Sequence, residues 1–193
     1  NIYHEHYNYW SVLSLSNFFN KLNLQISNVE HIETHGGSIR VYVGNKGCIV
    51  DKSVNKFISK ELEFGLDKIE TYEDFANKVY QYKSNVMRKL KELKDNGKRI
   101  VGYGSPAKAT TVLNYYGIDN TYIDYIIEDN ELKHNHLLPG VRIPIKSKNG
   151  ILKNPPDYVL VLAWNFLDYI KQNNKDLIDA GCEFITLKHL ERE

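Results

Sequence analysis

The segment that most constrains the fold of this chain is residues 99–110, in which a short apolar run leads through a glycine turn into a helix-like sequence. Gly102 and Gly104 allow a tight turn because neither carries a Cβ. Ser105 is expected to cap the following helix, and Pro106 to take its first position, where a missing N–H costs nothing. Such a turn aims free backbone N–H groups and a positive helix end at one point, which predicts a phosphate site. The spacing G-x-G-x-x-A also fits a loose dinucleotide-binding fingerprint.

Strands and helices are expected to alternate through the last half of the chain. The expected strands are 99–103, 122–128, 141–145, 157–163 and 183–187, and the expected helices are 106–116 and 166–180, the second capped by Asn165. Apolar strands between helices are typical of a parallel sheet covered on both faces. We therefore predict an α/β fold, with a Rossmann-like domain over residues 98–193.

Two smaller regions are expected before this domain. Residues 48–97 carry apolar positions at helical spacing, which predicts a helical connector. Residues 1–47 combine a polar, ionisable start with two strands joined by a turn at 34–37. This first region is too small to be a comfortable domain, and the chain begins at Asn1. We expect the chain to be a fragment of a longer protein.

Composition narrows the class of protein. The 193 residues carry a net charge of +1, which gives no reason to expect nonspecific binding to nucleic acid. Cys48 and Cys182 lack the spacing of metal ligands, which favours a reduced, cytoplasmic protein. No apolar run approaches the ~20 residues of a membrane span, and no signal peptide is visible. No membrane partner is therefore expected.

Polar residues follow three of the expected strands, where ligands bind in open parallel sheets. Together with Gly102, these candidate binding residues are Gly104, Ser105 and Lys108, then Glu128, Asp129 and Asn130, then Trp164 and Asn165. They could hold a phosphate, a sugar or ribose, and a base, or they could be ordinary caps and turns. Glu128 or Asp129 lies where the fingerprint places its ribose-binding acid, so an NAD(P)-binding oxidoreductase is one alternative.

A second group of candidates lies near the start of the chain. Tyr3, His4, Glu5 and His6 form a dense acid–base cluster, suited to removing a proton near neutral pH. His4 and His6 could share a face and bind a metal, but no third ligand is obvious, so no metal site is predicted. The cluster could also be a polar strand end. His35 begins a glycine turn that either closes a hairpin or lets the backbone approach a ligand.

In combination, these motifs resemble the C-methyltransferase family that modifies nucleotide-linked deoxy-keto-sugars. The resemblance covers most of the chain and is specific because the motifs occur together and in order. It rests on Tyr3-His4-Glu5-His6, Thr34-His35-Gly36-Gly37-Ser38-Ile39-Arg40, Gly102-Tyr103-Gly104-Ser105-Pro106-Ala107-Lys108, Leu138-Pro139-Gly140 with Ile143-Pro144-Ile145, and Trp164-Asn165.

The resemblance implies a parent enzyme in three parts. These are a zinc-binding N-terminal region, a central methyltransferase domain that binds S-adenosylmethionine, and a C-terminal Rossmann-like domain that holds much of a nucleotide-diphosphate sugar. Residues 1–47 would be the tail of the central domain, and residues 98–193 the C-terminal domain. The zinc cysteines and the cofactor-binding glycine motif have no counterpart in this sequence. Whether this chain catalyses methyl transfer by itself is therefore left open.

The resemblance also implies roles for the first residues. Tyr3, Glu5 and His6 match residues that line the family's active site. We expect His6 to remove the proton beside the sugar ketone, with Glu5 and Tyr3 orienting it or stabilising the enolate, which then attacks the methyl group of S-adenosylmethionine. His35 is a second candidate base. A non-catalytic nucleotide-binding module and a homodimer are left open.

Overall fold

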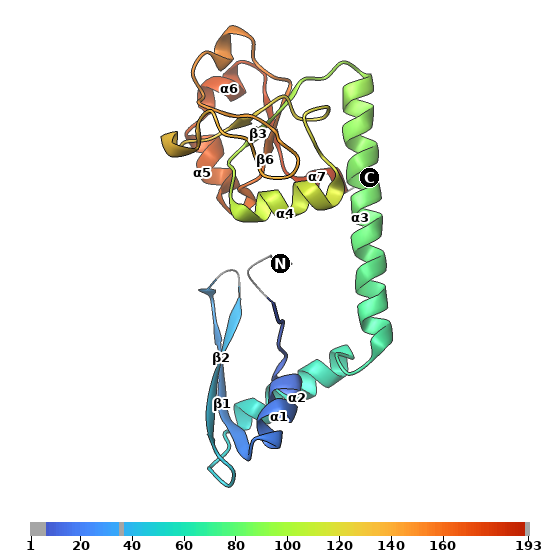
Figure 1. The fold of residues 1–193 in the computed structure, drawn as a ribbon, viewed down its shortest axis with the longest axis vertical. Helices are drawn as coiled ribbons and strands as arrows, with labels where there is room; N and C mark the ends of the chain where they lie inside the picture. Colours follow the sequence, from blue (N-terminus) through green and yellow to red (C-terminus); the bar gives the residue numbers. More distant parts are fainter. Residues whose placement is uncertain (1–6, 35–36, 192–193) are drawn as a thin grey trace. The chain divides into compact units, whose positions relative to one another are not determined.

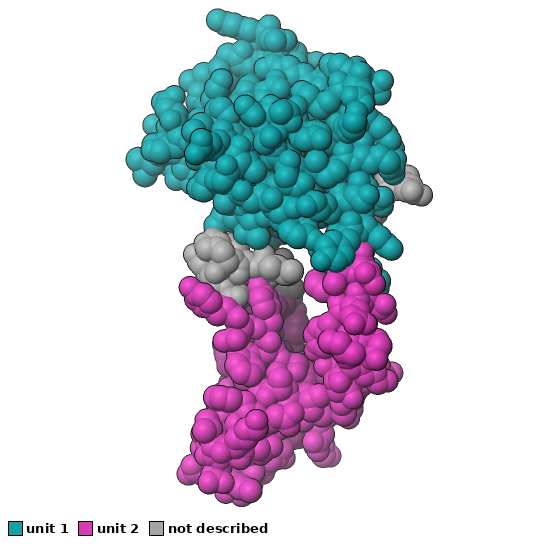
Figure 2. All heavy atoms as spheres, turned by 45° about the vertical axis from the view of Figure 1, so that its right-hand side comes forward, with its two compact units in different colours: residues 1–5, 78–193 teal, residues 6–77 magenta. Residues whose placement is uncertain are grey.

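The computed structural model describes residues 7–34 and 37–191 and divides into two compact units. The first extends through Asn77, and the second begins at Lys78 (Figure 2). No helix in these described ranges is both long enough and apolar enough to cross a membrane.

The first unit is a β-hairpin packed against short helices. In chain order it contains α1 (Val12–Lys21), β1 (Leu24–Ile32), β2 (Ser38–Asn45), α2 (Lys52–Phe64) and the start of α3 (Ile69–Asp95) (Figure 1). β1 and β2 pair in antiparallel register, which confirms the expected hairpin. The buried side chains of Val12, Ile26, Val29 and Val54 form the core. Ile26 and Val29 are three residues apart but are both buried, because the register of β1 shifts between Ile26 and Asn28.

The second unit is an α/β domain. After the C-terminal part of α3 it contains β3 (Ile100–Tyr103), α4 (Ala107–Tyr116), β4 (Ile126–Ile127), β5 (Ile145–Lys146), β6 (Tyr158–Val161), α5 (Leu167–Gln172), α6 (Lys175–Asp179), β7 (Glu183–Ile185) and α7 (Leu187–Glu191). Three short 3₁₀ helices connect them, η2 (Glu131–Lys133), η3 (Ile151–Lys153) and η4 (Trp164–Phe166).

The five strands form a parallel sheet in the order β5-β4-β3-β6-β7. The chain runs outward from β3 through β4 to β5, and then crosses back to β6 on the other side of β3. This reversal makes the gap between β3 and β6 a topological switch point, where open α/β sheets bind ligands. The predicted Rossmann-like arrangement is confirmed.

Both faces of the sheet are covered, as the apolar strands predict. Ile100 of β3 belongs to a core cluster with Leu90 of α3 and Leu113 of α4. Val101, the next residue, belongs to a second cluster with Ile170 of α5 and Leu177 of α6. Successive residues of β3 therefore face opposite sides of the sheet, with Ile100 toward α3 and α4 and Val101 toward α5 and α6.

The β5 side of the sheet is built differently from the centre. The N–H of Ile145 donates to the His136 carbonyl at 2.9 Å, and the Ile145 carbonyl accepts from the Asn135 N–H at 3.0 Å. The loop before β5 therefore lies against its outer edge. The crossover from β5 to β6 contains η3 but no α-helix.

Three expected elements differ most from the prediction. The extended piece expected at 141–145 is strand only at Ile145, where β5 begins, and Arg142 within it has a left-handed φ of +55°. The strand expected at 122–128 is only Ile126–Ile127, since the N–H groups of Tyr122 and Ile123 turn back to the Asp119 carbonyl. The helix expected at 166–180 is divided into α5 and α6 around Asn174. Asn165 lies within η4 and does not cap a continuous helix.

Candidate functional site

The glycine turn at the end of β3 requires both of its glycines. Gly104 has a φ of +81°, and a Cβ there would lie 2.9 Å from the Ala163 Cβ, beyond the end of β6. A Cβ on Gly102 would lie 2.9 Å from Ile126 Cγ1 in β4. The missing side chains therefore allow the turn to pass close to both neighbouring strands.

The helix after the turn starts one residue later than the sequence suggests. Pro106 is the N-cap of α4, with an extended backbone at φ −68° and ψ 157°, and it provides no side-chain cap. Ser105 precedes the cap and is 8% exposed. Its N–H donates to Glu128 Oε2 at 2.8 Å, and its hydroxyl donates to the same oxygen. The expectation that Ser105 caps the helix was therefore wrong, because the carboxylate of Glu128, just after β4, accepts from both of its donors.

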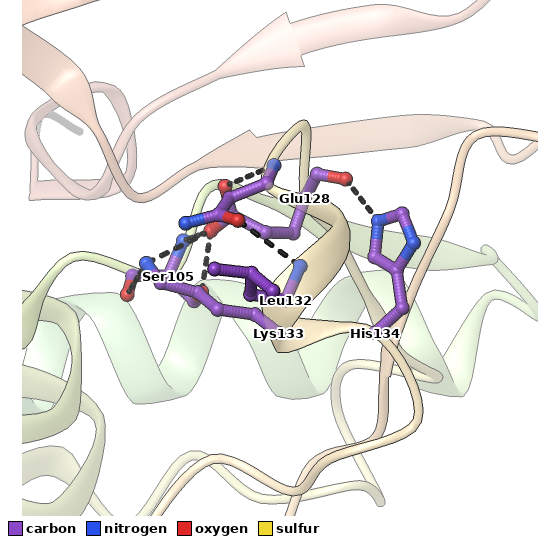
Figure 3. A network of polar contacts seen from close by, with 6 residues as sticks. Ser105, Glu128, Leu132, Lys133 and His134 are labelled. Carbon is purple, nitrogen blue, oxygen red and sulfur yellow. Dashed lines mark hydrogen bonds and ion pairs between the residues drawn. The ribbon is translucent and has the colours of Figure 1, made fainter.

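Glu128 is the centre of a polar network at the ends of β3 and β4 (Figure 3). Its Oε1 accepts from the Asn130 N–H at 3.2 Å, and Lys133 Nζ lies 3.4 Å from Oε2. Lys133 Nζ also donates to the Ser105 carbonyl at 3.1 Å. His134 Nε2 lies 2.7 Å from the Glu128 carbonyl. The network ties together the glycine turn and η2.

The environment of Glu128 keeps its carboxyl group ionised. Burial acts to raise its pKa, but hydrogen bonds from Ser105 and Asn130, together with the charge of Lys133, outweigh burial and place the pKa below its ordinary value. Carboxylates that accept several hydrogen bonds are favoured in the charged form. The positive charge of Lys133 is thus partly balanced within the turn itself.

A second polar chain supports the neighbouring Asp129. The Tyr103 hydroxyl donates to Asp129 Oδ1 at 2.9 Å, and Asn174 Nδ2 donates to the Tyr103 hydroxyl oxygen at 3.2 Å. Burial, offset in part by the Asn174 hydrogen bond and reinforced by Asp129, raises the pKa of Tyr103 to about 12. Asp129 itself is exposed at the rim of the sheet. Its carboxylate can therefore accept from a ligand while Tyr103 fixes its position.

Sequence reasoning did not find Tyr103 and Asn174. Asn174 is 1% exposed and donates to the Ile170 carbonyl at 2.7 Å as well as to Tyr103. Within the described ranges its buried Oδ1 has no hydrogen-bond partner. The available signal was a phenol inside an otherwise apolar strand, since a buried hydroxyl needs a partner.

Lys108 and Trp164 meet at the switch point. Lys108 Nζ lies 4.2 Å from the centroid of the Trp164 ring, which is a cation–π contact between the start of α4 and the residues after β6. Burial lowers the pKa of Lys108. Asn165, the next residue, is exposed in η4. The ends of β3 and β6 therefore present a cation, an aromatic face and an amide together.

The structure brings the strand-end candidates to one edge of the sheet, because β4, β3 and β6 are hydrogen-bonded neighbours. Within the described chain, the first-turn N–H groups of Ala107 and Lys108 have no hydrogen-bond partner. Asn130 is exposed, and its Oδ1 accepts from the Leu132 N–H at 3.0 Å, which caps η2. The edge combines two lysines with exposed acceptors, a combination suited to a ligand that has phosphate and hydroxyl groups.

The candidates for proton transfer lie outside the described residues. Tyr3, His4, Glu5 and His6 precede residue 7, and His35 lies in the interval between 34 and 37. Among the residues that are described, no three His, Cys, Asp or Glu side chains come together as a metal site.

Comparison of the sequence with known proteins shows the family to which the chain belongs. The family model described as "C-methyltransferase C-terminal domain" matches residues 33–187. The chain is 32% identical over 186 residues to C-methyltransferase NovU of Streptomyces niveus, an alignment that covers 95% of this chain and 44% of that protein. The chain thus spans less than half the length of this relative. Neither match supports the oxidoreductase alternative. By both matches, the chain belongs to the C-methyltransferase family and contains its C-terminal domain.

Proposed function

We propose that this chain is the nucleotide-sugar-binding part of an S-adenosylmethionine-dependent C-methyltransferase that acts on a nucleotide-linked deoxy-keto-sugar. The family membership supports methylation of carbon. The observation that carries the substrate class is the group of strand-end residues at the switch point between β3 and β6, where α/β sheets bind nucleotides.

The charges at this edge favour the diphosphate of such a substrate. Lys108 and the unpartnered first-turn N–H groups of α4 would hold phosphate oxygens. The exposed face of the Lys108–Trp164 pair offers an aromatic surface for a base or sugar ring. Asp129, positioned by Tyr103, would accept hydrogen bonds from ribose or sugar hydroxyls. Glu128 would hold the turn in shape through Ser105.

The same edge does not fit S-adenosylmethionine or zinc. S-adenosylmethionine carries a sulfonium cation, whereas Lys108 already places a positive charge at the turn, where Lys133 is paired with Glu128. Zinc needs three or four converging donors, a set that residues 7–34 and 37–191 do not provide. We therefore assign neither group to this domain, and both belong to the proposed parent enzyme.

Proton removal is proposed for the residues at the start of the chain. His6 would take the proton from the carbon beside the ketone, and Glu5 and Tyr3 would orient the imidazole or stabilise the enolate oxygen. His35 is the second candidate for the base. The enolate carbon that remains is the nucleophile that C-methylation requires.

Calorimetric titration of the chain with thymidine diphosphate glucose and uridine diphosphate glucose tests the binding role. We expect binding to at least one of them, with Lys108→Met weakening the affinity about tenfold, because a charge-assisted hydrogen bond is lost. Lys188→Met removes the same charge from the exposed face of α7 and serves as the control. Absence of affinity for either compound, or equal binding by Lys108→Met, contradicts the proposal. Tighter binding of NADH than of both sugars would favour the oxidoreductase alternative.

A further inference from the structure

The second unit contains a cleft apart from the strand-end site. Its volume is about 400 Å³, and its lining includes Arg99, Tyr125, His134, Asn135, Lys146 and Asn154. We name it the Arg99–Lys146 cleft. We infer that it is a binding site for a small phosphate-bearing ligand, a role beyond the nucleotide-sugar function proposed above.

The cleft follows from the short crossover after β5. Tyr125 packs against the same core cluster as Val101 and Ile127, so it lies on the sheet face covered by α5 and α6. Over β4 and β5, however, the crossover from β5 to β6, which is described throughout, supplies η3 and no α-helix, and Ile151 of η3 fills part of that face. A short 3₁₀ helix covers less of a sheet than an α-helix does. The remaining space is bounded by polar side chains, where a packed α/β face would be apolar.

Two cations line this space. Lys146 Nζ lies 4.9 Å from the centroid of the Tyr125 ring, and no ion pair involves Lys146 in the described parts of the chain. Arg99 is held in place, because its Nε donates to Asp124 Oδ2 at 2.9 Å and its Nη1 donates to the Asn154 carbonyl. Burial raises the pKa of Tyr125, and the charge of the nearby Arg99 opposes this effect.

Positive charge exceeds negative charge around the cleft. The acid beside it, Asp124, is shared by Arg99 and by Lys94, whose Nζ lies 3.6 Å from Asp124 Oδ1. Asp124 therefore does not neutralise the charge of Lys146, which can bind an anion. A positioned guanidinium beside an ammonium is a combination that binds phosphate, since the first offers a planar set of donors and the second a point charge. The amides of Asn135 and Asn149 can bond to an organic part.

The cleft shares one wall with the strand-end site. His134 lines the cleft, and its Nε2 lies 2.7 Å from the Glu128 carbonyl. The two sites are nevertheless distinct, because Ser105, Lys108 and Trp164 do not line the cleft, whose Arg99 and Asn154 precede β3 and β6. A ligand in the cleft would therefore contact the segment that carries Glu128 without occupying the glycine turn.

Amide NMR spectra of the full 193-residue chain, recorded during titration with inorganic phosphate, test this inference. We expect saturable shifts at Tyr125, Lys146 and Asn149. Lys146→Met should weaken this binding about tenfold, as expected when one charge-assisted contact is lost. Lys146 is exposed, so the variant should keep the wild-type spectrum elsewhere. The control Lys188→Met should bind as the wild type does.

The results that overturn the inference are equally specific. They are shifts confined to Gly104–Lys108, no saturable shifts at all, or equal phosphate binding by Lys146→Met and the wild type. A parallel titration with ribose 5-phosphate distinguishes the source of the phosphate. Binding at least tenfold tighter than that of inorganic phosphate assigns an organic ligand, and equal affinity assigns free phosphate.

Discussion

The Glu128 carboxylate, which follows β4, closes the glycine turn by accepting both the N–H and the hydroxyl of Ser105, which lies between β3 and α4. In a dinucleotide-binding fold, the acid at this strand end is expected to face a ribose. Here it binds the turn itself, and Lys133 approaches it from η2. Glu128 therefore joins the glycine turn, the end of β4 and η2 before any ligand binds.

Glu128→Gln should lower the free energy of unfolding by about 1–3 kcal/mol, because the buried donors of Ser105 lose a charged acceptor. Urea unfolding measures the change. Glu131→Gln, at an exposed position in η2, is the matched control and should stay within about 0.5 kcal/mol of the wild type. Equal losses in the two variants would show that the Glu128 contacts contribute little.

The same contact predicts a pH dependence. The pKa of Glu128 in the folded chain lies below its ordinary value of 4.5. The stabilisation is therefore fully present above pH 4.5 and is lost as the pH falls through the folded value. Urea unfolding between pH 3 and 7 should show the advantage of the wild type over Glu128→Gln shrinking below about pH 4.5. A constant difference across this range would rule out the ionised pairing.

Tyr103 predicts a change at the alkaline end. Its pKa is raised from 10.0 to about 12, so the folded chain favours the neutral phenol. The stabilisation is complete below pH 10 and is lost as the pH rises toward 12. Tyr103→Phe should be about 1 kcal/mol less stable than the wild type at pH 7, through its lost hydrogen bonds. Thermal unfolding at pH 10 and above should show the gap narrowing, and a widening gap would contradict the assignment.

Gly104→Ala should destabilise the chain more than Gly117→Ala does. Both glycines have left-handed backbones, at φ +81° and +76°, so both substitutions carry a strain of about 1 kcal/mol. Only at Gly104 would the new Cβ approach Ala163, whereas nothing lies within 4 Å at Gly117. The expected extra loss at Gly104 is about 1–3 kcal/mol, by analogy with overpacked cores. Guanidinium unfolding midpoints measure the two losses. Equal losses would show that Ala163 does not lie close to Gly104.

The sequence predicted the central fold because its signals there are local. Val101 and the residues around it are continuously apolar, and Gly102 and Gly104 mark where the strand must turn, so β3 and the parallel sheet could be foreseen. The β-hairpin of the first unit was equally clear from alternation in 38–43.

The remaining differences come from contacts between segments distant in sequence. Ser105 is a residue type that often caps helices. Its N–H and hydroxyl instead donate to the carboxylate of Glu128, 23 residues later in the sequence. The expected helix breaks at Asn174, whose amide donates to Tyr103, 71 residues earlier. Such pairs depend on strand order and register, which propensity and periodicity do not encode. The assignments of Tyr3, Glu5, His6 and His35 stay predictions.

The loop against β5 has a consequence for assembly. An exposed strand edge is a template on which another chain can add a strand. At β5 the N–H and carbonyl of Ile145 are already bonded to His136 and Asn135, and the preceding Pro144 has no N–H to donate. Self-association through a continuous intermolecular sheet is therefore blocked at this side, which protects the domain from growing into fibrous aggregates along β5.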